Sequence, residues 1–171
     1  MDRERLTRTL LGVFADAEFF IADRVHEYVN THWFLRGLVH IEHRGNIYMF
    51  IFNNKDIVGI NGPYNVNGAL LLLTNWTPNM TLQNFNITHT NLWMQLHGIL
   101  VEYFHQENIL NLARTAGEII AADWHAEETR ALQFAKIKIR VAVNAPLISG
   151  NYLQTLENIP TWISFKYERI F

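Results

Sequence analysis

The feature that most constrains the fold of this chain is a strict two-residue alternation in residues 91–98. The apolar side chains of Leu92, Met94 and Leu96 fall on one side. The other side carries Trp93, Gln95 and His97. A period of two residues is typical of a β-strand, so one face should enter a core. The second face either stacks an unpaired base on Trp93 or is covered by another element, because tryptophan is usually largely buried.

Similar patterns along the chain predict an α+β fold. Apolar alternation or apolar runs predict strands at 8–14, 37–43, 47–52, 69–75, 118–124, 135–143 and 161–170. Helical spacing predicts helices at 17–33 and 106–116, a short helical turn at 55–60, and a polar or helical turn at 126–131. The first half thus has the order strand, helix, strand, strand, short helix, strand, which is the ferredoxin-like, split βαβ order. The second half repeats it with its second helix reduced or missing.

The length of 171 residues favours one compact domain or two small fused halves. We expect a first βαββαβ half at 1–76, a polar connection rich in Asn and Thr at 77–90, and a second βαββ-β half at 91–171.

The net charge of −2 is not that of a typical nucleic-acid-binding protein, but its distribution is uneven. Residues 1–50 carry six basic and seven acidic groups, and residues 51–128 carry two basic and seven acidic groups. Residues 129–171 carry six basic and two acidic groups, for a local net charge of +4. The basic character is therefore concentrated in the last quarter of the chain.

Composition also excludes several classes of protein. The chain has no cysteine, so it forms no disulfide and no thiolate metal site. Its first residues are charged and lack an apolar stretch, and the apolar runs, such as Ala69–Leu73, are too short to span a membrane. We expect an intracellular protein, in the nucleus or the cytoplasm, without a membrane partner.

No pattern predicts a metal site, a cofactor or catalysis. The two histidines of His40-Ile-Glu-His43 fall on opposite faces of a predicted strand and cannot share an ion. No nucleophile elbow, phosphate-binding loop or pair of carboxylates is present. We therefore expect a protein that is not an enzyme and needs no small-molecule cofactor.

Four segments, at 62–78, 92–98, 138–150 and 162–169, occur in the order and spacing of one known family. They resemble the plant domain of unknown function (DUF 4283) of LINE-type retrotransposon proteins, which commonly precedes a CCHC zinc knuckle. The resemblance runs from about Leu10 to the last residue. It implies a fold like that of RNA-recognition modules and a role in nucleic-acid binding in, or derived from, a plant retroelement.

The chain departs from the family pattern at three places. Tyr64 stands where the family usually has tryptophan, and Leu100 where proline often follows the His-Gly segment. The sequence ends at Phe171, about where the knuckle would begin. We therefore expect any binding that the knuckle supplies to be absent from these 171 residues.

A candidate nucleic-acid site follows if the strands at 92–98 and 135–143 are neighbours. One sheet face would then carry a stacking ring, two base-edge groups and four cations, namely Trp93, Gln95, His97, Lys136, Lys138, Arg140 and Lys166. Phosphate contacts should dominate, because the third strand carries cations where RNA-recognition modules carry aromatics. The alternative is a solvated cationic face that serves solubility.

The first half offers a competing surface. Tyr48, Phe50 and Phe52 alternate with apolar residues after Arg44-Gly45, faintly like an RNA-binding strand, and the sequence does not decide which face is core. The expected function is binding of single-stranded RNA or DNA with low sequence specificity, and of the two we expect RNA. The alternative is a protein–protein or self-association module, with nucleic acid bound by a separate zinc knuckle.

Overall fold

The computed structural model describes residues 2–15, 22–33, 37–53, 63–124 and 134–168. It is an α+β structure in which two antiparallel β-sheets dominate and helices are few. The chain divides into two compact units, Met1–Ile87 and Thr88–Arg169, and each contains one five-stranded sheet. None of the helices in the described parts of the chain has the length and apolar character needed to cross a membrane.

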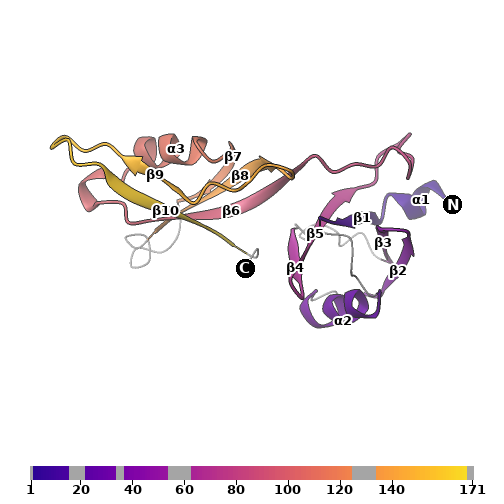
Figure 1. The fold of residues 1–171 in the computed structure, drawn as a ribbon. Coiled ribbons are helices and arrows are strands. Elements are labelled where there is room, and N and C mark those ends of the chain that lie inside the picture. The colour runs from indigo at the N-terminus through magenta and orange to yellow at the C-terminus, as the bar shows by residue number, and fades with distance from the viewer. Residues whose placement is uncertain (1, 16–21, 34–36, 54–62, 125–133, 169–171) are drawn as a thin grey trace. The chain divides into compact units, whose positions relative to one another are not determined.

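The first unit contains a sheet with the strand order β2-β3-β1-β5-β4 (Figure 1). Its elements are α1 (Arg3–Leu6), β1 (Thr9–Phe14), α2 (Ala22–His32), β2 (Val39–Arg44), β3 (Ile47–Phe52), β4 (Tyr64–Val66) and β5 (Ala69–Asn75). Every residue of β3 is buried, as expected for a strand that is apolar on both faces and lies inside the sheet.

One face of this sheet packs against α2. Val25, Val29 and Trp33 form a single core cluster with side chains of β1, β3, β4 and β5. Three aromatic side chains of β3 belong to this cluster and are at most 5% exposed, namely Tyr48, Phe50 and Phe52. These aromatics are therefore core residues, and the first-half stacking surface considered from the sequence is wrong because α2 covers it.

The opposite face of the first sheet is covered by the segment that follows β5. Leu11, Met49 and Ile51 form a second buried cluster, against which Trp76, Met80 and Phe85 pack. The segment expected from its composition to be a polar connection thus contributes apolar side chains to the first unit. The first sheet is covered on both faces by its own chain.

The second unit contains a sheet with the strand order β7-β8-β6-β10-β9 (Figure 1). Its elements are β6 (His89–His97), the 3₁₀ turn η2 (Val101–Tyr103), α3 (Gln106–Arg114), β7 (Glu118–Asp123), β8 (Phe134–Ala142), β9 (Gly150–Leu153) and β10 (Thr161–Tyr167). Burial alternates along β6, β8 and β10. The buried set includes Met94, Leu96, Ile137, Ile139 and Ile163, all fully buried.

Of the elements that the structure describes in this unit, the α-helix α3 covers the apolar face of the sheet. It buries Ile109, Leu112 and Ala113 and packs against β7 and β8. The alternation along the strands then turns the other set of side chains to the opposite side of the sheet.

The predicted strands and longer helices agree with the structure to within a few residues where they are described. Four short elements were not predicted, namely α1, β4, η2 and β9, because three or four residues are too few for a periodic pattern. The predicted turns at 55–60 and 126–131 lie outside the described residues.

Candidate nucleic-acid interface

The sheet of the second unit brings the seven predicted site residues onto one face. β8 and β10 flank β6 on either side, so Trp93 lies opposite Lys138, and Gln95 lies opposite both Lys136 and Lys166. The full set on the face away from α3 is Trp93, Gln95, His97, Lys136, Lys138, Arg140 and Lys166. We call this side of the second sheet the open face.

Trp93 is partly exposed and stands beside two lysine ammonium groups. Lys136 Nζ lies 5.0 Å and Lys138 Nζ 5.8 Å from the centroid of its ring. Both distances are those of cation–π contacts, which hold a ring and a cation together on an exposed surface. The alternative that Trp93 is a core residue is therefore wrong, since its side chain lies on the open face rather than in the buried set.

A carboxylate that the sequence analysis did not include lies among these groups. Glu168 forms an ion pair with Lys136 (Oε2 to Nζ, 3.0 Å) and accepts a hydrogen bond from Gln95 Nε2 (2.8 Å). Gln95 Oε1 in turn accepts from His97 Nε2 at 2.9 Å, which sets the ring proton on that nitrogen. Gln95 and His97 are thus engaged with protein partners, and the charge of Lys136 is balanced.

The remaining cations are less constrained. Arg140 Nη1 lies 3.9 Å from Glu118 Oε2, a long contact between two exposed side chains. In the part of the chain that the structure describes, no carboxylate oxygen lies within 4.0 Å of Lys138 or Lys166. Lys138 and Lys166 therefore offer the positive charges that are most available to an anion.

His97 is an aromatic and hydrogen-bonding group rather than a cation. Burial lowers its pKa below the ordinary value, and the positive charge of Lys166 lowers it further. Its ring stacks on Phe134, with centroids 4.9 Å apart and planes 29° from parallel. At neutral pH the neutral imidazole extends the aromatic surface of the open face.

Three aromatic residues of this face were missed by the sequence analysis. They are Phe134, at the start of β8, and the exposed Trp162 and Tyr152, which lie opposite each other on β10 and β9. The alternation that places Lys166 on the open face also places Trp162 there, so that pattern could have found it. Tyr152 lies on β9, which carries no periodic pattern of its own.

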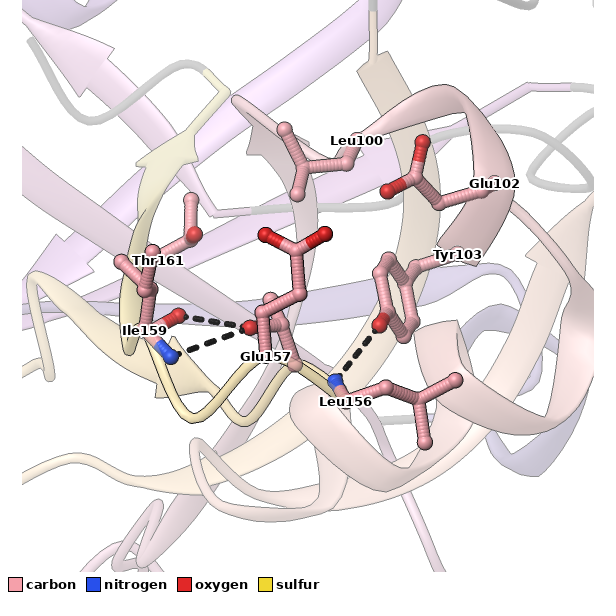
Figure 2. A pocket seen from close by; sticks show the side chains of 8 residues that line it. Leu100, Glu102, Tyr103, Leu156, Glu157, Ile159 and Thr161 are labelled. Carbon is pink, nitrogen blue, oxygen red and sulfur yellow. Dashed lines mark hydrogen bonds between the residues drawn. The ribbon is translucent and has the colours of Figure 1, made fainter.

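A cleft lies in the same unit, beyond the end of β6 (Figure 2). It has a volume of about 460 Å³ and is lined by Leu100, Tyr103, Leu156 and Ile159 among others. The backbone N–H of Leu156 donates to the Tyr103 hydroxyl oxygen at 2.8 Å, which ties the β9–β10 loop to η2. The carboxylates of Glu102 and Glu157 point into this cleft, so it disfavours phosphate.

Within the described ranges, no three histidine, aspartate or glutamate side chains are grouped so that they could hold a metal ion. The chemistry that the open face offers is therefore stacking, hydrogen bonding and attraction of anions.

Comparison with known proteins identifies a similar plant protein but no family. No protein-family model matches the sequence. No solved structure matches it. The chain is similar to the uncharacterized protein At4g02000 of Arabidopsis thaliana, with 27% identity over 108 residues. The match covers 63% of this chain and 34% of that protein, so the chain corresponds to about a third of the relative's length.

Proposed function

We propose that the second unit binds single-stranded nucleic acid, RNA by preference, on the open face of its sheet. The observation that carries this proposal is Trp93, a partly exposed indole beside the ammonium groups of Lys136 and Lys138. Proteins that bind single strands combine aromatic side chains, on which bases stack, with cations that track the phosphates. The open face has both kinds of group on adjacent strands.

Binding on this face would have low sequence specificity. An incoming base stacks on Trp93 and takes the place of the Lys138 ammonium group, which then turns to a phosphate, while Lys136 stays paired with Glu168. The groups that could discriminate between bases, Gln95 and His97, already hydrogen-bond to Glu168 and to each other. The proposed activity is non-enzymatic and uses no cofactor.

The strand orders support a ferredoxin-like, RNA-recognition-like fold for both units. In each sheet the first strand of the unit lies between the third strand and the last one, as in β7-β8-β6-β10 and β2-β3-β1-β5. The short edge strands β4 and β9 extend this arrangement. The proposal of an intracellular role in, or derived from, a plant retroelement rests on the sequence resemblance to the plant retrotransposon-associated domain.

Replacing Trp93 with alanine tests the stacking that the proposal requires. Loss of one stacked base should weaken binding of a labelled single-stranded RNA roughly five- to 150-fold. Fluorescence anisotropy at low and moderate salt measures the change. Trp124→Ala, which removes an exposed indole next to β7, should leave the affinity as it is. Absence of any RNA binding by the unmodified chain at low salt would refute the proposed function.

Removing the charge of Glu168 should strengthen binding. Glu168→Gln keeps a partner for Gln95 but releases Lys136 for a phosphate, so RNA affinity should rise roughly threefold, as expected from loss of a weak surface ion pair. The slope of log affinity against log salt should steepen by about 0.7. Glu107→Gln on α3 removes the same charge from the covered side of the sheet and is the matched control. Equal gains in both variants would show that only net charge matters.

Self-association is the second candidate function, and exposed apolar side chains around the cleft favour it. Val101 is 75%, Leu156 93% and Ile159 62% exposed, and such patches often mark protein contacts. Light scattering distinguishes the two functions, since self-association would give a mass above the 20.0 kDa of the chain. That mass should survive Lys138→Ala plus Arg140→Ala and fall to that of the monomer in Leu156→Asp.

A further inference from the structure

The open face carries a second exposed aromatic site at the end farthest from Trp93. Trp162 and Tyr152 are 46% and 55% exposed, and their ring centroids lie 5.0 Å apart in an edge-to-face contact at 68°. They pair across β10 and β9, on the same face as Lys166. Large aromatic side chains that remain exposed together are typical of binding surfaces.

Gly150 fixes the position of Trp162. A Cβ at Gly150 would lie 2.5 Å from Cζ2 of the Trp162 ring and would also collide with the Ile163 carbonyl oxygen. The indole therefore packs directly over the glycine backbone of the neighbouring strand, as aromatic residues do over glycines at sheet edges. Tyr152 contacts the ring as well. A ring fixed in this way loses little conformational entropy when a ligand binds.

The pairing of β10 with β6 sets the separation of the two aromatic sites. The backbone N–H of Glu168 donates to the carbonyl of Trp93, and Ser164 lies opposite His97. Trp162 is six residues before Glu168 on the strand, which corresponds to roughly 20 Å at the usual rise per residue. The neutral stack of His97 and Phe134 lies between the two ends.

The charges of the open face are distributed unevenly between these ends. Lys138 and Arg140 lie on β8 beside β6 at the Trp93 end, and Lys166 lies between the ends. Among the described residues of the Trp162 end, those at 97–105 and 150–163 include no lysine or arginine. The cleft next to this end carries the carboxylates of Glu102 and Glu157 (Figure 2). The Trp93 end thus attracts phosphates, whereas the Trp162 end can stack a base but does not attract a phosphate.

We propose that Trp162 is a second stacking platform, which holds the terminal unpaired base of a short single strand whose phosphates contact Lys138 and Arg140. This inference rests on the proposed function, because it assigns the length of the same site and the position of its far end. The separation fits about four nucleotides, at the lower end of the site sizes found for single-strand platforms. The bound nucleic acid ends at Trp162 because the carboxylates of Glu102 and Glu157, in the cleft next to this end, repel phosphate.

A length series of labelled oligouridines tests the inference. Trp162→Ala should lower the affinity for a hexanucleotide about tenfold, as loss of one stacked base does, and leave a dinucleotide unaffected. The salt dependence should stay that of the unmodified chain, because no phosphate contact is lost. Trp124→Ala is the matched control, being a 39% exposed tryptophan beside β7 at the other edge of the sheet. Trp162→Phe, which keeps a stacking ring, should retain most of the hexanucleotide affinity.

Photo-crosslinking provides a second measurement that needs no variant. A hexanucleotide with 4-thiouridine at one end should crosslink to the tryptic peptide 141–166, which contains Trp162. The same label at the other end should crosslink to peptide 56–114, which contains Trp93. Both peptides extend along the whole face, so tandem mass spectrometry must assign each crosslink to its residue, and each end of the oligonucleotide should label one of the two aromatic sites only.

Two results would overturn the inference while leaving the proposed function intact. In the first, Trp93→Ala weakens binding but Trp162→Ala binds hexanucleotides like the unmodified chain. In the second, both ends of the hexanucleotide crosslink equally to the two aromatic sites, at Trp93 and at Trp162. If the unmodified chain binds no oligonucleotide, the proposed function itself fails.

Discussion

Replacing Lys138 and Arg140 together with alanine is expected to lower the affinity for single-stranded RNA roughly 10- to 100-fold at low salt. Both side chains lie on β8 beside Trp93 and Asn91 of β6. Lys138 has no carboxylate within 4.0 Å among the described residues, and Arg140 has only a long contact with Glu118. Their charges are therefore available to phosphates.

The salt dependence distinguishes lost phosphate contacts from lost folding. Removing two contacts to a single strand should reduce the slope of log affinity against log salt by about 1.4. Anisotropy titrations at several salt concentrations give this slope. Arg24→Ala plus Arg44→Ala removes two exposed arginines from the first unit and is the charge-matched control. An equal loss in this control would mean that overall charge, and not the open face, determines binding.

Replacing Phe50 with alanine is expected to destabilise the first unit by about 3–5 kcal/mol. Phe50 is fully buried, its ring centroid is 5.0 Å from that of Trp33, and it lies in the cluster that α2 covers. Amide hydrogen exchange measures the loss, because amides of β1 and β3 should exchange faster. Amides of β6 and β8, in the second unit, serve as an internal reference.

The same variant tests the stacking role that the sequence allowed for this strand. If Phe50 were a base-stacking residue, Phe50→Ala would weaken RNA binding and leave hydrogen exchange unchanged. We expect the reverse at temperatures where the first unit remains folded. Leu38→Ala is the control, because Leu38 is 79% exposed and such substitutions rarely change stability by more than about 0.5 kcal/mol.

The two sheets differ in what lies on the face away from the helix. In the first unit, Trp76, Met80 and Phe85 cover Leu11, Met49 and Ile51. In the second unit the corresponding face carries Trp93, Lys138 and Lys166, whose side chains remain at least partly exposed. The contrast is consistent with a structural first sheet and a second sheet that presents a ligand-binding surface.

The sequence by itself determined where most strands lie and which side chains share a face. In an extended backbone successive side chains point to opposite sides, so alternation in β6, β8 and β10 can be predicted from local sequence. That property sufficed to group Trp93, Gln95 and His97, and to group the cations of β8. It could not reveal β9, whose four residues are too few to show a period.

Only the tertiary structure decided which faces are covered and which charges are free. The hydrogen bond between Gln95 and Glu168 joins residues 73 positions apart, and Lys136 is neutralised by the same carboxylate. Likewise, the covering of Met49 by the segment after β5 depends on how that segment folds back onto the sheet. Such contacts depend on the register in which the strands pair and on which segments fold back onto the sheet. Both are set by the whole sheet and not by any local pattern.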